Sequence, residues 1–309
     1  MTNSNTIIIN LKAVLLLAVL AIMQVQPVIA SDKDSIALAN AKWQTLYDGN
    51  GVQLKVASFH IFNAPQNVTI LTFNVKEFSL HVGVCDTLVE VSRMAESLKA
   101  DFAINGSFFD FAGPALTFIK QNGCVHSSGI SHEQTSRNNW GLVVADSNSR
   151  SVQIIPSVYN DMLQKSAAYD NVLASYPLLL QGRTICLDSC DYVPNKFNNR
   201  NPRSLVAIDS DGNIAFVTID GRAEGKAMGM TLYEECKMAL WLGFTDALNL
   251  DGGGSTTLWT HTSGVVNYPS DNKMFDHEGE RKVSNILYIR HIPCPRRSHG
   301  RDNQVSGRF

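Results

Sequence analysis

The sequence lacks an apolar run long enough to cross a bilayer as a helix, which takes roughly 20 residues. Its most apolar stretch, AVLLLAVLAIM, covers only residues 13–23. The basic residue Lys12 precedes this stretch, and the small-residue site Val28-Ile29-Ala30 follows it. This arrangement is typical of a cleavable signal peptide over residues 1–30, with an uncleaved anchor as the minor alternative. We therefore expect a secreted or periplasmic protein with no transmembrane segment after signal removal.

An excess of positive charge is also absent. Removing residues 1–30 deletes Lys12 and no acid, so 25 basic residues remain against 28 acidic ones, a net charge of −3. Such a chain is not expected to bind nucleic acid. No Pro/Ser-rich linker or internal repeat interrupts residues 31–294, which favours a single domain. Residues 295–309 are basic without apolar periodicity and are predicted to form a disordered tail. The sequence does not indicate the oligomeric state.

The usual zinc motifs are missing as well. The eight histidines form no HExxH pattern, and the pair Cys186 and Cys190 has no second pair to match it. All six cysteines follow residue 30, and an even number in an exported chain permits disulfides, with Cys186 to Cys190 as the best local pair. Cys236 falls on the apolar face of a predicted helix and is expected to be a buried thiol. No cofactor is predicted.

The most informative feature that is present is an acid followed by three glycines. The segment DALNLDGGGSTTLW places Asp251 directly before Gly252, Gly253 and Gly254. Glycines let a ligand approach the backbone closely, and free N–H groups in such a turn can bind an anion. Asn249 lies two residues before Asp251, so both side chains of an extended strand would point to one face. For this segment alone, a tight turn in which glycine only relieves strain is equally favoured.

A second acid ends a second predicted strand. Residues 214–219 form a buried apolar run that stops at Asp220. Between the strands, Thr231 and Glu234 have the spacing of a capping box, and apolar residues follow at helical intervals. Strand, helix and strand indicate a parallel βαβ crossover, which would bring Asp220 and Asp251 to one edge of the sheet. A shared catalytic role requires both carboxyl groups to lie there with access to solvent.

Elsewhere the chain predicts strands joined by short turns. A DGNG turn joins two alternating runs within residues 46–62, and NVTILTF with FSLHVGV predicts a second hairpin. Residues 91–99 predict a helix. Residues 209–213 superficially resemble a calcium loop, but the later bidentate acid is missing, so a hairpin turn is favoured. The predicted class is α+β (mixed α/β): a mixed β-sheet with flanking helices and at least one parallel βαβ crossover.

Two further segments carry candidate ligands. ADFAINGSFFDF contains Asn105, whose amide could bind a sugar or phosphate oxygen. Taken alone, an Asn-Gly turn beside core phenylalanines is favoured. EGERKVSNILYIR carries Arg281 and Asn285 just ahead of an alternating strand, where a guanidinium could hold a phosphate bidentately. Taken alone, a solvated charge cluster is favoured there.

Together these segments resemble the phosphodiester glycosidase family. The residues that carry the resemblance are NPRSLVAIDSDGNIAFVTIDGRAEGKAMGMTLYEECKMALWLGFTDALNLDGGGSTTLW, then GVVNYPSDN and GERKVSN, with INGSFFD and SYPLLLQGR earlier in the chain. The resemblance covers roughly residues 52–292 and is loose over residues 110–201. It implies a mixed β-sheet with flanking helices and release of a sugar from a sugar-phosphate-sugar diester. It also implies active-site roles for Asn105, Asp220, Asn249, Asp251, Arg281 and Asn285, with Arg203 and Arg222 as further candidates.

Our hypothesis for the chemistry places Asp251 at the anomeric carbon as base or nucleophile. Asp220 would assist as acid/base or bind sugar hydroxyls, Arg281 would hold the phosphate, and the three asparagines would orient the substrate. The substrate would be a sugar-phosphate-sugar diester or an envelope phosphoglycan. One alternative is metal-assisted phosphodiester hydrolysis, with a divalent cation held by Asp220, Asp251 and Asn105. Another is an envelope carbohydrate-binding protein without turnover.

Overall fold

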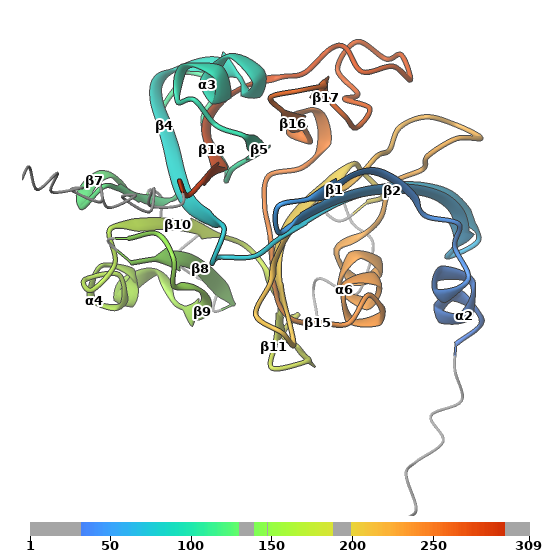
Figure 1. The fold of residues 1–309 in the computed structure, drawn as a ribbon, viewed down its shortest axis with the longest axis horizontal. Coiled ribbons are helices and arrows are strands. Elements are labelled where there is room, and N and C mark those ends of the chain that lie inside the picture. The colour runs from blue at the N-terminus through green and yellow to red at the C-terminus, as the bar shows by residue number, and fades with distance from the viewer. Residues whose placement is uncertain (1–31, 130–138, 147, 188–198, 294–309) are drawn as a thin grey trace, which may run out of the picture.

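The computed structural model describes residues 32–129, 139–146, 148–187 and 199–293. The predicted signal peptide and tail lie outside these residues. The described residues contain three β-sheets, in which every strand pair is antiparallel, and a few short helices (Figure 1). No helix in the described ranges is long and apolar enough to cross a membrane.

The largest sheet has eight strands in the order β1-β2-β3-β14-β13-β15-β11-β12. It therefore combines the first three strands of the described chain with strands from residues 178–249. Its strands are β1 (Gln44–Gly49), β2 (Val52–Ile61), β3 (Ala64–Phe73), β11 (Leu178–Gln181), β12 (Thr184–Ile185), β13 (Arg203–Asp209), β14 (Ile214–Ile219) and β15 (Phe244–Asn249).

Two five-stranded sheets complete the architecture, in the orders β7-β6-β10-β8-β9 and β17-β16-β5-β18-β4. The first contains β6 (Phe118–Gln121), β7 (Cys124–Ser128), β8 (Trp140–Ala145), β9 (Val152–Ser157) and β10 (Asn171–Ser175). The second contains β4 (Phe78–Glu90), β5 (Phe102–Asn105), β16 (Leu258–Thr260), β17 (Gly264–Val265) and β18 (Lys282–His291).

The helices lie at the outside of the sheets. In Figure 1, α2 and α6 lie beside the eight-stranded sheet, α3 beside β4 and α4 beside β9. These helices are α2 (Lys33–Ala39), α3 (Val91–Ser97), α4 (Met162–Lys165) and α6 (Leu232–Trp241), and short 3-10 turns occur at η1 (Tyr159–Asp161) and η2 (Gly253–Ser255).

The central strands of the large sheet are buried on both faces. Along β14, Ile214 and Phe216 belong to a core shared by the three sheets, whereas Ala215 and Val217 belong to a second core shared with α2 and α6. This alternation follows from the two-residue period of a strand. It explains why the sequence of β14 is apolar throughout although its neighbours are antiparallel.

The predicted parallel βαβ crossover is wrong. Strand β13 lies between β14 and β15 and pairs antiparallel with both, with Arg203 opposite Ile219 and Leu205 opposite Asn249. The α+β class with a mixed sheet is corrected accordingly to a mostly β fold made of antiparallel sheets. A continuous apolar strand is typical of parallel sheets, but burial on two faces produces the same pattern here. Because both strands oppose β13, their C-terminal ends still point to the same edge.

The local predictions have mixed outcomes. The helix over residues 91–99 is confirmed as α3, the first hairpin as β1 and β2, and the turn over residues 209–213 as the link between β13 and β14. The second hairpin is wrong, because β4 pairs with β18 in another sheet.

The cysteines also differ from expectation. Cys236 is fully buried, as predicted, and its thiol donates to the Leu179 carbonyl at 3.2 Å. The Cys186 thiol is free and lies 3.4 Å from the Thr184 carbonyl oxygen. The expected Cys186 to Cys190 disulfide is therefore not formed, and Cys190 itself lies outside the described residues.

Candidate active site

The two aspartates flank the entry to β13. Each one precedes a glycine that packs against Pro202. A Cβ on Gly221 would lie 2.7 Å from the Pro202 nitrogen, and a Cβ on Gly252 would lie 2.7 Å from the Pro202 oxygen. Any larger residue at these two positions would therefore separate the turns that carry Asp220 and Asp251.

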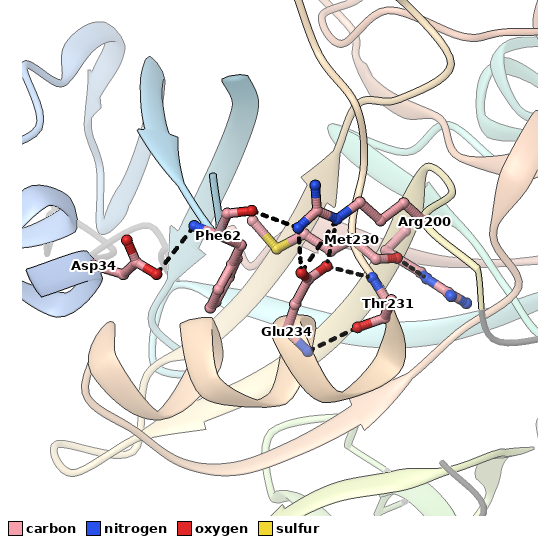
Figure 2. A network of polar contacts seen from close by, with 7 residues as sticks. Asp34, Phe62, Arg200, Met230, Thr231 and Glu234 are labelled. Carbon is pink, nitrogen blue, oxygen red and sulfur yellow. Dashed lines mark hydrogen bonds and ion pairs between the residues drawn. The ribbon is translucent and has the colours of Figure 1, made fainter. Parts of the chain in front are cut away.

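The position of Pro202 is fixed by an ion-pair network at the preceding residues (Figure 2). Arg200 donates from Nε to Glu234 Oε2 at 3.0 Å and from Nη2 to the Phe62 carbonyl. Glu234 in turn accepts from the Thr231 backbone N–H at 2.9 Å, while the Thr231 hydroxyl oxygen accepts from the Glu234 N–H at 3.2 Å. This confirms the predicted capping box at the start of α6. Through Arg200, the capped helix thus anchors residues 200–202, against which the glycines after both aspartates pack.

Asp251 is partly exposed and well supported. Its Oδ2 accepts from the Ser255 hydroxyl at 2.6 Å, and its Oδ1 accepts from the Gly252 N–H at 3.0 Å. Burial raises the pKa of the Asp251 carboxyl, while the Ser255 bond and the charge of Arg281 oppose this increase. A carboxylate held in this way has a fixed orientation, in a residue that is partly exposed.

Asp220 is at the same edge but has no exposed surface. Its Oδ1 accepts from the Asn267 amide at 3.1 Å and from the Tyr268 N–H at 2.9 Å, whereas its buried Oδ2 has no partner. Burial raises the pKa of Asp220 to about 7. In this conformation Asp220 does not meet the requirement of solvent access.

A short chain of contacts links the two acids. Asn267 donates through Nδ2 to Asp220 Oδ1 and also to the Thr256 carbonyl at 3.0 Å. Thr256 directly follows Ser255, the residue that holds Asp251. The two acids are thus connected by hydrogen bonds through Asn267 and the backbone of residues 255–256.

The three predicted asparagines connect backbone segments. Asn105 donates through Nδ2 to the Asp251 carbonyl at 2.6 Å and accepts from the Ser204 hydroxyl at 2.7 Å. Asn285 accepts from the Ser107 N–H at 2.7 Å, and Asn249 donates to the Tyr176 carbonyl at 2.6 Å. Asn105 and Asn285 have no exposed surface, and Asn249 has almost none. The buried Oδ1 of Asn249 has no partner.

Arg281 is paired with an acid that the sequence analysis did not identify. Its Nε and Nη2 donate to the two carboxylate oxygens of Asp271 at 2.7 and 2.9 Å. Its guanidinium also lies 5.6 Å from the centre of the Phe111 ring. Phe111 is 76% exposed and is not a core residue. Asp271 lies in GVVNYPSDN, so the resemblance contained the only sequence signal for it.

The other two arginines differ in their surroundings. Arg203 is buried and donates to the Met230 carbonyl at 2.8 Å. Burial lowers the pKa of its guanidinium, an effect that the charges of Glu235 and Asp251 oppose. Arg222 is exposed, in the left-handed region at φ 60°, and donates from Nη2 to Asn201 Oδ1 at 3.0 Å.

The glycines of the DGGG turn allow the exposed Arg222 and the partly buried Arg281 to approach. A Cβ on Gly253 would lie 2.8 Å from Arg222 Nη2, and a Cβ on Gly254 would overlap with Arg281 Nη2. The N–H groups of Gly252 and Gly253 already have acceptors, Asp251 Oδ1 and the Pro202 carbonyl. An anion at this turn would therefore be bound mainly by the arginines.

Another buried acid near the site, Glu235, was not among the predicted residues. Glu235 on α6 is fully buried, and neither carboxylate oxygen has a hydrogen-bond partner. Its place among the apolar positions of the helix was the available sequence signal.

The part of the chain that the structure describes contains no group of three or more His, Cys, Asp or Glu residues arranged to hold a metal ion.

A family model described as phosphodiester glycosidase matches residues 98–290. The chain belongs to the phosphodiester glycosidase family. This match includes all the candidate residues named above, from Asn105 to Asn285.

Curated relatives of the chain agree with this family assignment. The N-acetylglucosamine-1-phosphodiester alpha-N-acetylglucosaminidase of Bos taurus is 30% identical over 102 residues, which are 32% of this chain and 19% of that enzyme. The aligned part thus spans less than a quarter of the curated relative.

Two solved structures share the fold. One is the catalytic domain of the zebrafish N-acetylglucosamine-1-phosphodiester alpha-N-acetylglucosaminidase, auto-inhibited by its pro-peptide, with a TM-score of 0.62 and 17% identity over 81% of this chain and 87% of that one. The other is a hypothetical protein from Synechocystis, with a TM-score of 0.60 and 18% identity over 80% and 63% of the two chains. At these identities the likeness shows a common fold.

Proposed function

We propose that the protein is an exported hydrolase that cleaves the glycosidic bond of a sugar-1-phosphodiester of the GlcNAc-1-phosphate type. The products are a free sugar and a phosphomonoester. Family membership supports the reaction class, and the apolar pattern of residues 13–23 supports export. The natural substrate class would include envelope phosphoglycans.

The observation that carries this proposal is the environment of Asp251. It is the one predicted catalytic carboxylate with solvent access, and it lies on a glycine turn against which Arg222 and Arg281 pack. A sugar phosphate bound here would have its anomeric carbon near a carboxylate and its phosphate near two guanidinium groups. This arrangement stabilises both an oxocarbenium-like transition state and the leaving phosphate.

The bond changes are those of a hydrolysis. The bond from the anomeric carbon to the phosphate oxygen breaks, and its electron pair leaves with the phosphomonoester. The oxygen of a water molecule ends on the anomeric carbon. Asp251 either removes the proton from that water or first forms a bond to the carbon that water then displaces. The phosphate is a good leaving group at neutral pH, so little acid assistance is required.

Asp220 has a positioning role in this proposal. Its carboxyl is sealed from solvent, and it holds Asn267 and Tyr268. These residues precede Ser270 and Asp271, which contact Arg222 and Arg281. Asp220 thereby fixes the segment that presents the two guanidinium groups.

The test is hydrolysis of methyl N-acetylglucosamine-1-phosphodiester in water enriched in oxygen-18. Label in the free sugar is the expected result, because water attacks carbon. Label in the phosphate, with activity lost on chelation, would support a metal-dependent phosphodiesterase instead. Calorimetric binding with no product formed would support a carbohydrate-binding protein.

A further inference from the structure

A pocket of about 270 Å³ lies beside the candidate active site, between residues 221–226 and 270–275. Three of its lining side chains are cationic, namely Arg222, Lys226 and Lys273, against a single acidic one. The chain as a whole has a net charge of −2. The positive charge of the pocket is therefore a local feature, of the kind that attracts an anion.

The cations of this pocket are not neutralised. Within the described ranges, none of the three forms an ion pair with a carboxylate. Arg222 donates only to neutral oxygens, those of Asn201 and Ser270. Arg281 on the other side of the glycine turn is different, because Asp271 accepts from it at two points. On the pocket side, an incoming anion would meet three cations without an ion-pair partner and one opposing charge, that of Glu224.

One aromatic side chain, Phe275, lines the pocket and is stacked on a second ring behind it. The ring of Phe275 lies parallel to that of Tyr268, with centroids 4.0 Å apart and an interplanar angle of 3°. Lys226 Nζ lies 5.2 Å from the centre of the Phe275 ring. Contact between this cation and the ring limits where the ammonium can move. The pocket thus combines oriented cations with a flat apolar surface.

The pocket is directly connected to the site of the proposed reaction. Arg222 contacts Ser270, which lines the pocket, and its Nη2 lies against Gly253 of the DGGG turn. Arg222 therefore borders both the glycine turn and the pocket that Lys226 and Lys273 line.

We propose that this pocket binds a second anionic group, a phosphate on the acceptor side of the diester. The preferred substrates are then acceptors that carry more than one phosphate, as a repeating phosphoglycan does, rather than isolated diesters. This inference rests on the proposed function, which places the phosphate of the bond to be cleaved near Arg222 and Arg281. The second group binds to Lys226, Lys273 and the free side of Arg222.

The kinetic test compares two diesters of N-acetylglucosamine-1-phosphate, one with a methyl acceptor and one with a 3-phosphopropyl acceptor. The wild type is expected to have a roughly tenfold lower KM for the second substrate, as one added charge contact can give. In the double variant Lys226→Met/Lys273→Met the ratio of the two KM values falls to about one. The double variant Lys42→Met/Lys76→Met, at exposed positions elsewhere, keeps the wild-type ratio. Equal KM values in the wild type would overturn the proposal.

A binding measurement separates this inference from the reaction itself. Calorimetry with propane-1,3-diol bisphosphate and with methyl phosphate needs no turnover. The proposal for the pocket is supported if the wild type binds the bisphosphate more tightly and Lys226→Met/Lys273→Met does not. This holds even if neither diester is cleaved, and in that case only the proposed reaction fails. Equal binding of both compounds overturns the pocket, whether or not the methyl diester is hydrolysed.

Discussion

Arg281 and Asp271 form a two-point ion pair, with Nε to Oδ2 at 2.7 Å and Nη2 to Oδ1 at 2.9 Å. The pair lies against Gly254, where a Cβ would overlap with Asp271 Oδ1. The glycine is thus required by the space that the ion pair occupies. It places a guanidinium next to the turn that carries Asp251.

Replacing this glycine should disrupt the ion pair. We expect Gly254→Ala to lower kcat/KM on the methyl diester by at least about tenfold, because the added methyl group must displace Asp271 or Arg281. Gly49→Ala is the matched control, since a Cβ there meets nothing closer than 3.5 Å. Steady-state kinetics and thermal unfolding of both variants provide the measurement. Wild-type kinetics for Gly254→Ala would show that the pair has no part in substrate binding.

The second prediction concerns Asp251. The substitution Asp251→Asn keeps the shape of the side chain but removes its charge and basicity, so kcat should fall on the order of 10³-fold. The unfolding midpoint should stay close to that of the wild type. Asp211→Asn, the same change on an exposed turn, should leave kcat unaltered. An Asp251→Asn protein that retains wild-type turnover would rule out our assignment.

The third prediction follows from the buried acid on α6. Burial raises the pKa of Glu235 to about 8, against an ordinary value of 4.5, and the charge of Arg203 only partly opposes this increase. The folded state then keeps a proton that the unfolded state releases between about pH 4.5 and 8. The free energy of unfolding therefore falls as pH rises through this window.

Replacing the Glu235 carboxyl should change how steeply the free energy of unfolding depends on pH. We expect Glu235→Gln to gain stability relative to the wild type as pH rises, by roughly 1 kcal/mol per pH unit between pH 5 and 8. Urea unfolding of both proteins at several pH values measures this difference in stability. Glu278→Gln, at an exposed position, should follow the wild type throughout. Parallel curves for Glu235→Gln and the wild type would mean that Glu235 is ionised when folded.

The fourth prediction concerns the network in Figure 2. Arg200 binds both Glu234 and the Phe62 carbonyl. The substitution Arg200→Met therefore leaves Glu234 Oε1 and the Phe62 carbonyl oxygen without this donor. We expect a loss of about 2 kcal/mol in the free energy of unfolding.

The control for Arg200 is a surface ion pair. Arg93 pairs with Glu90 at 3.5 Å and its side chain is 75% exposed, so Arg93→Met should cost less than about 1 kcal/mol. Denaturant unfolding compares the two. If both substitutions have the same small effect, the Arg200 network does not stabilise the entry to β13.

Interactions between residues close in sequence were predictable. The spacing of Thr231 and Glu234 predicted the start of α6, and the turn over residues 209–213 predicted the link between β13 and β14. The family could also be predicted, because its motifs are runs of consecutive residues such as DGGG.

Interactions across the sheet were not predictable from these patterns. An apolar run such as residues 214–219 results from burial on two faces, and that burial is the same beside parallel and antiparallel neighbours. The sequence therefore could not show that β13 separates β14 from β15. For the same reason it could not show that β4 leaves β3 for another sheet.

By itself, the sequence determined that two acids end two apolar strands and that glycines follow each acid. Only the tertiary structure decided that Asp251 is partly exposed, whereas Asp220 is buried and accepts hydrogen bonds from Asn267 and Tyr268. The physical reason is that local patterns depend on neighbours in the chain. Solvent access and charge pairing instead depend on segments that approach only when the sheets pack, as Asp271 approaches Arg281.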